Sequence, residues 1–174
     1  MRAIDVHVHP GTRGLDGDAY LYFKRDPNAL PKTEGEFAAL FAKQQVKALL
    51  IGWHPSTVKE GTRITNEYVL ELAVKYPDSF AGVLASVDMG GEKSDERVRQ
   101  AQELAGKPLV KGFKFHPPDQ GFYPGERKYY ELWEALAASG KPVMFHTGFT
   151  VLGADSDGGK GIALDHGRPI HLDT

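Results

Sequence analysis

The chain has 174 residues, of which 41% are hydrophobic and 25% charged, and its formal net charge is -2 at pH 7. This composition is typical of a soluble globular protein and excludes a strongly basic surface for nucleic acid or membrane. The absence of cysteine excludes disulfides, thiolate metal sites and cysteine nucleophiles. No apolar run approaches the ~20 residues of a membrane span, and no signal peptide opens the chain, so we expect a cytoplasmic protein.

The chain begins with a short β-branched segment, Ile4 to Val8, that predicts a strand. Residues two apart in a strand point to the same face, so His7 and His9 should direct their imidazoles to one side. Pro10 ends the strand because it cannot donate a hydrogen bond to a neighbouring strand. The pair is interpreted either as two nitrogen ligands of a metal ion or as two polar residues at a strand end.

Helices and strands then alternate along the chain. Residues 10–32 form a long connection that predicts a lid or binding loop. Thr33 and Glu36 form a capping box, which predicts the start of a helix that runs to residue 45. The hydrophobic pattern predicts further strands over 46–53, 80–87, 109–116 and 142–146, and further helices over 65–75, 94–105 and 126–139. The buried face of the last helix should comprise Tyr130, Trp133, Leu136 and Ala137.

Five strand–helix units in this order favour the α/β class and a parallel sheet with right-handed crossovers, as in a (β/α)8 TIM barrel. A closed barrel needs about 200 residues or more, so we expect a partial barrel of about five units. Residues 1–174 are then a single domain that forms the N-terminal portion of the barrel. Residues 148–168 are rich in glycine and aspartate and predict an irregular loop at the rim, and Pro169 should open one more helix.

Histidine ends four of the five predicted strands: His9, His54, His116 and His146. Active sites of parallel α/β proteins lie at the carboxyl ends of the strands. Packing alone does not explain four histidines there, because each buried imidazole needs its own hydrogen-bond partner. A convergent metal or acid–base site explains them together, whereas His166 and His171 are expected nearer the surface.

The fourth predicted strand places Gly112, Lys114 and His116 on one face. Both Lys114 and His116 should therefore point toward the mouth of the barrel. His116 is interpreted as a site residue. Lys114 is interpreted either as a second site residue or as a lysine that reaches solvent past the end of the strand.

Three segments together resemble the amidohydrolase superfamily. They are Ile-Asp-Val-His-Val-His-Pro at residues 4–10, Gly-Phe-Lys-Phe-His-Pro at 112–117 and Pro-Val-Met-Phe-His-Thr-Gly at 142–148. The pattern is most similar to the amidohydrolase-related branch that contains aminocarboxymuconate-semialdehyde decarboxylase. The resemblance implies a (β/α)8 barrel with one divalent metal ion, for which zinc is the expected metal. It implies the ligands His7, His9 and His146, and substrate-facing catalytic roles for His116 and Lys114.

The family also uses a sixth-strand histidine and an eighth-strand aspartate, which have no counterpart here because the chain ends first. The resemblance implies a hydrolase that acts on a small organic substrate, since zinc lowers the pKa of bound water to ~7. A decarboxylase, and thus a lyase, of the same branch fits equally. Two alternatives stay open: a His-x-His barrel phosphoesterase or nuclease, and a non-catalytic metal-binding fragment or half-barrel that needs a partner. We expect a small-molecule substrate, no nucleic acid and no membrane, with homo-oligomerisation undecided.

Overall fold

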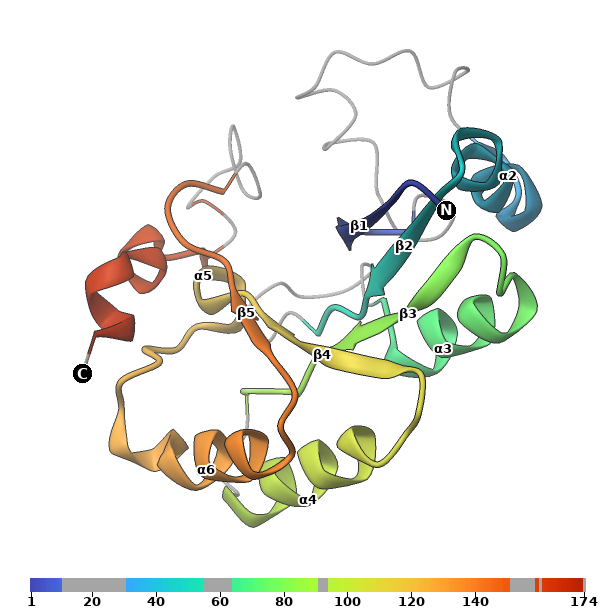
Figure 1. Cartoon of the computed structure of the whole chain (residues 1–174). Helices are drawn as coiled ribbons and strands as arrows, with labels where there is room; N and C mark the ends of the chain where they lie inside the picture. The colour runs from blue at the N-terminus through green and yellow to red at the C-terminus, as the bar shows by residue number, and fades with distance from the viewer. Residues whose placement is uncertain (11–30, 55–63, 91–93, 151–158, 160, 174) are drawn as a thin grey trace.

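The computed structural model describes residues 1–10, 31–54, 64–90, 94–150, 159 and 161–173 (Figure 1). Within these residues, five parallel strands form one sheet in the order β1-β2-β3-β4-β5. Each strand pairs with its neighbour in sequence, and helices alternate with the strands. The sheet is curved, with helices α2, α3, α4 and α6 along its convex side (Figure 1). This architecture confirms the prediction of a partial TIM-type barrel.

The strands are β1 (Ala3–Val8), β2 (Val46–Ile51), β3 (Phe80–Ala85), β4 (Val110–Phe115) and β5 (Val143–Phe145). The α-helices are α2 (Glu34–Gln44), α3 (Asn66–Lys75), α4 (Ser94–Ala105), α5 (Pro117–Gln120) and α6 (Tyr130–Ala138). The described 3-10 helices are η2 (Arg127–Tyr129), η4 (Leu164–Gly167) and η5 (Pro169–Leu172). Of the helices in the described part of the chain, none is long and apolar enough to cross a membrane.

Local sequence signals set the ends of the first helices. The Thr33 hydroxyl accepts a hydrogen bond from the Glu36 N–H at 3.1 Å, which satisfies a donor that the first turn of α2 leaves unpaired. Gln45 ends this helix in the left-handed conformation, with φ of 57°. The Thr65 hydroxyl caps α3 in the same way by accepting from the Tyr68 N–H at 3.2 Å. These caps account for the agreement between the predicted and observed starts of α2 and α3.

The pairing of β4 with β5 positions the residues that follow both strands. A Cβ on Gly112 would lie 2.7 Å from the Pro142 carbonyl oxygen, so only glycine allows this close approach. Phe115 packs outward, with its ring centroid 5.1 Å from that of Trp133 in α6. Lys114 precedes Phe115 in the strand and therefore points to the opposite, concave side of the sheet.

After β4 the structure adds the short helix α5 over residues 117–120, for which the sequence analysis predicted no element. The next helix also begins later than predicted, because its first turn is the 3-10 helix η2. That turn shifts the helical phase, so the predicted buried residue Tyr130 is 43% exposed while Tyr129 and Leu132 are buried.

The remaining boundaries differ at the strand ends and in the tail. Strands β2 to β5 are each shorter than predicted. Trp53 and His54 follow β2, His116 follows β4 and His146 follows β5, each just outside its strand. The tail was predicted to be irregular over residues 148–168, but η4 is a 3-10 turn within it, and η5 replaces the predicted final helix. Residues 151–158, and all but the first residue and last two residues of the predicted lid at 10–32, lie outside the described part.

Candidate metal and substrate site

His7 and His9 lie side by side at the carboxyl end of β1. Their Nε2 atoms are 3.3 Å apart, so the two imidazoles share one side of the strand, as the spacing predicted. Burial lowers the pKa of both rings, to about 4 for His9, and the positive charge of Lys114 acts in the same direction. Both imidazoles are therefore neutral at pH 7, which is the form that binds metal ions.

His116 and His146 form a second pair at the ends of β4 and β5. The strand register pairs Phe115 with Phe145, and the His146 N–H donates to the Phe115 carbonyl oxygen at 2.9 Å. The two following histidines therefore face the same way, and their rings stack with centroids 3.8 Å apart and planes 19° apart. Burial lowers the pKa of both rings, to about 2 for His116.

The predicted metal ligands do not meet in one cluster in this structure. Across the described ranges, no group of three His, Cys, Asp or Glu side chains is arranged to hold a metal ion. His146 turns back on its own chain, where its Nε2 donates to the Phe149 carbonyl oxygen at 3.0 Å. A carbonyl only accepts, so Nε2 carries the hydrogen and Nδ1 is the nitrogen of His146 with an available lone pair.

The geometry of the first pair fits a metal ion nonetheless. Two nitrogens that each lie ~2.0–2.1 Å from one tetrahedral ion are about 3.3–3.4 Å apart. The Nε2 atoms of His7 and His9 are 3.3 Å apart, which matches that separation. A hydrogen bond between them would use the lone pair of only one of the two nitrogens. Two neutral imidazoles with no thiolate nearby suit a borderline divalent ion such as zinc.

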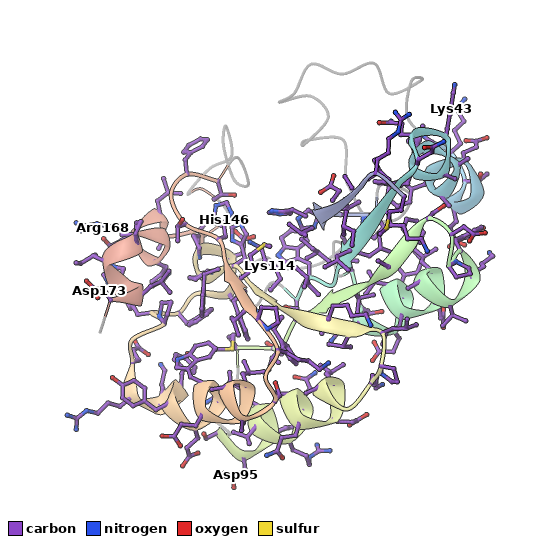
Figure 2. All side chains as sticks on the ribbon, viewed as in Figure 1. Lys43, Asp95, Lys114, His146, Arg168 and Asp173 are labelled. Carbon is purple, nitrogen blue, oxygen red and sulfur yellow. The ribbon has the colours of Figure 1, made fainter. Side chains whose placement is uncertain are left out.

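Lys114 supplies a positive charge at the same rim. It is only 4% exposed and lies on the concave side of β4, and Figure 2 shows it on the strand next to that of His146. Burial lowers the pKa of Lys114 to about 8, and the negative charge of Asp119 opposes this change. Most of the lysine is therefore protonated at pH 7. Its charge reaches all four rim histidines, because it lowers the pKa of each of them.

Asp119 is a site residue that the sequence analysis did not identify. Its side chain is fully buried, and its Oδ2 lies 3.1 Å from the Nδ1 of His116. Burial raises the pKa of this carboxyl group to about 7, while the nearby Trp53 side chain and the charge of Lys114 act the other way. The signal was available in the sequence, because an aspartate in the turn after a strand-end histidine can reach that ring when Pro117 starts a helix.

We define the rim cluster as His7, His9, Lys114, His116 and His146. His54 follows β2, one residue after the isolated bridge between Trp53 and Ile64. The last two histidines belong to a second group, the C-terminal cluster, which we define as Tyr123, Asp165, His166, Arg168 and His171. There Asp165 accepts from the Tyr123 hydroxyl at 2.9 Å.

A curved parallel sheet with helices along its convex side defines a β/α-barrel protein, a class in which active sites lie at the carboxyl ends of the strands. The family model described as amidohydrolase matches residues 4–174. The chain therefore belongs to the amidohydrolase family. No curated protein matches the sequence.

Three solved structures are similar in fold. The 5-carboxyvanillate decarboxylase LigW2 from Novosphingobium aromaticivorans, with bound manganese and 3-methoxy-4-hydroxy-5-nitrobenzoic acid, has a TM-score of 0.60 at 18% identity over 97% of this chain. LigW from Sphingomonas paucimobilis has a TM-score of 0.58 at 17% identity over 98% of this chain. IDCase from Metarhizium anisopliae, in its apo form, has a TM-score of 0.52 at 12% identity over 82% of this chain.

These identities are low, so the three likenesses concern the fold. The chain spans 59% of the length of each of the two LigW chains and 50% of the IDCase chain. Five strands of an eight-stranded barrel would make up a similar share of a whole barrel chain.

Proposed function

We propose that this chain carries the metal-binding and substrate-facing rim of a divalent-metal-dependent decarboxylase that acts on a small organic acid. The observation that carries the proposal is the placement of Lys114, a buried cation among neutral histidines. A site of this kind attracts an anion, and its burial strengthens the interaction with a carboxylate. The decarboxylases among the structures of similar fold support the same reaction class.

The metal-binding part of the proposal rests on His7 and His9, with His146 as the third ligand. The separation of 3.3 Å between the first two Nε2 atoms supports it. His146 would join them through a rotation that releases its hydrogen bond to the Phe149 carbonyl. A divalent ion held there would polarise a substrate oxygen as a Lewis acid. The manganese in the LigW2 structure makes Mn²⁺ a candidate beside Zn²⁺.

The remaining roles follow from charge and protonation. Lys114 is proposed to pair with the substrate carboxylate and hold it beside the histidines. In decarboxylation the bond from carbon to the carboxylate breaks, CO2 leaves, and the electron pair left on carbon takes up a proton. Lys114, with a pKa of about 8, holds a transferable proton near neutral pH, whereas His116, with a pKa of about 2, does not.

The experiment measures CO2 release by the full chain from a panel of hydroxylated benzoic acids, with Mn²⁺ or Zn²⁺ and with chelator. We expect metal-dependent release that His9→Ala and Lys114→Met abolish and that His171→Ala, in the C-terminal cluster, preserves. Esters, amides and phosphate monoesters are assayed in parallel. Turnover of one of those classes without CO2 release would replace the decarboxylase with a hydrolase or a phosphoesterase.

A further inference from the structure

The carboxyl group of Asp119 lies directly behind the rim cluster. Its side chain has no exposed surface, and its Oδ2 is 3.1 Å from the Nδ1 of His116. The two atoms are at hydrogen-bonding distance, although the N–H bond is not aligned with the oxygen in this conformation. Hydrogen bonds in active sites commonly become aligned only when substrate binds. Asp119 is thus the carboxylate placed to act on the His116 ring.

The turn that holds Asp119 is built on His116 itself. The N–H groups of Asp119 and Gln120 both donate to the His116 carbonyl oxygen, at 3.0 and 2.9 Å. The Gln120 side chain accepts from the His116 N–H at 2.9 Å and donates to the Val87 carbonyl oxygen at 2.9 Å. Because Pro117 and Pro118 restrict the backbone at the start of α5, the chain folds back so that the carboxyl group meets the ring.

Stability does not account for a carboxyl group in this position. Burying a carboxylate costs free energy unless it is fully paired, and a buried polar group is often replaceable by an apolar one without loss of stability. Gln120 already satisfies the backbone of this turn, so the carboxyl group is not needed to hold it. Among its contacts, the Asp119 carboxyl group reaches one ring nitrogen of His116 at the rim.

We propose that Asp119 is a positioning residue that accepts the Nδ1–H of His116, holds the ring in its stack on His146 and leaves Nε2 unprotonated. Because Nδ1 of the His116 ring faces Asp119, Nε2 on the other side of the ring faces away from it. The His116 ring already stacks on His146 with centroids 3.8 Å apart, so a tilt of one ring would bring its atoms against the other. His116 then presents a lone pair, rather than an N–H, to whatever binds at the rim. The role of His116 in turnover rests on the proposed function, but the prediction of its tautomer does not.

The first test reads the tautomer of His116 by long-range ¹H–¹⁵N NMR of the full chain at about pH 8.5, where Asp119, with a pKa of about 7, is ionised. The His116 signals are assigned by their loss in His116→Gln. We expect the wild-type ring to carry its hydrogen on Nδ1. In Asp119→Ala the hydrogen should move to Nε2, so that the two nitrogen shifts exchange places.

The matched control is Asp165→Asn, because Asp165 also contacts a histidine, with its Oδ2 3.3 Å from the Nε2 of His171. This change should leave the His116 signals in place. A wild-type ring with its hydrogen on Nε2 overturns the proposal without reference to any variant, so the test survives if Asp119→Ala does not fold. An unchanged tautomer in folded Asp119→Ala overturns it as well.

The second test concerns turnover in the proposed decarboxylation. Asp119→Asn should lower kcat by about 10- to 100-fold, the size of effect seen for residues that orient active-site histidines, with KM near the wild-type value because Lys114 is intact. Asp165→Asn should keep wild-type kinetics. If the tautomer depends on Asp119 but no substrate is turned over, the proposed function fails and the positioning role stands. If turnover occurs and Asp119→Asn does not change kcat, the positioning role fails.

Discussion

The rim cluster and the C-terminal cluster differ in the burial of their cation, although burial lowers the pKa of His166 in the second cluster as well. In the rim cluster the cation is Lys114, which is 4% exposed, and burial lowers the pKa of every histidine in the group. In the C-terminal cluster the cation is Arg168, whose side chain is 66% exposed and lies 3.3 Å from Asp165. The same Asp165 carboxylate also contacts His171 at 3.3 Å.

Solvent exposure explains the different behaviour of the two groups. Around Asp165, an ion pair and the Tyr123 hydroxyl stabilise the carboxylate, so the pKa of Asp165 is lowered. Such exposed pairs contribute little to stability. At the rim the cost of burying charge dominates, and it keeps the imidazoles neutral and available as ligands.

The largest difference between the two clusters should be the effect of a histidine substitution on metal affinity. His9→Ala removes a proposed ligand and should weaken the binding of Zn²⁺ or Mn²⁺ by at least about 100-fold, because even a residue behind a ligand is worth about 10- to 100-fold. His171→Ala should leave the affinity unchanged. Isothermal titration of the metal-free chain gives both values, and equal affinities in the two variants would place the ion elsewhere.

The pH dependence of stability should also follow the rim cluster. The unfolded chain protonates His9 near pH 6.5, whereas the folded chain does so only near its lowered pKa of about 4. The unfolded state therefore binds more protons between these values, so stability is complete above pH 6.5 and is lost as the pH falls toward 4. Partial exposure of the ring limits the contribution of His9 to about 1–2 kcal/mol.

Urea unfolding at a series of pH values measures this dependence. His9→Gln cannot take up the proton, so the loss of stability between pH 6.5 and 4 should be shallower than in the wild type. His171→Gln should keep the wild-type slope. Parallel curves for the wild type and His9→Gln would show that His9 is not buried in its neutral form.

Removal of the rim cation should produce a smaller change. Lys114→Met keeps the bulk of the side chain but removes the charge that lowers the pKa of His9, so this pKa should rise part of the way toward 6.5. The rise is only partial because burial is the larger cause. NMR titration of the metal-free chain measures it. Lys111→Met, an exposed lysine near the start of the same strand, is the control and should leave the His9 titration unchanged.

The smallest effect is expected in the C-terminal cluster. The Tyr123 hydroxyl is the main cause of the lowered pKa of Asp165, so Tyr123→Phe should raise that pKa toward its usual value of 3.8. Because both side chains face solvent, the thermal midpoint should stay essentially unchanged. Carboxyl NMR titration and a thermal melt test the two statements. A large drop in the midpoint would show that this cluster stabilises the fold, contrary to the comparison with the rim.

Much of the fold was predictable because its signals are local. The threonines that cap α2 and α3 act within one helical turn, and short apolar strands alternate with amphipathic segments along the chain. The pairing of His7 with His9 was also predictable, because two residues of one strand share a face whatever surrounds them. The assignment of His7, His9 and His146 as metal ligands, and of His116 and Lys114 as catalytic residues, remains a prediction.

The contacts across strands and turns were decided only by tertiary structure. The stack of His116 on His146 depends on the register of β4 against β5, which the close approach at Gly112 permits. The hydrogen bond from His146 to the Phe149 carbonyl depends on the path of the chain after β5, and it keeps this ring from the predicted ligand position. The contact between Asp119 and His116 arises within one turn, but the burial that raises the pKa of Asp119 and lowers that of His116 is a property of the packed molecule.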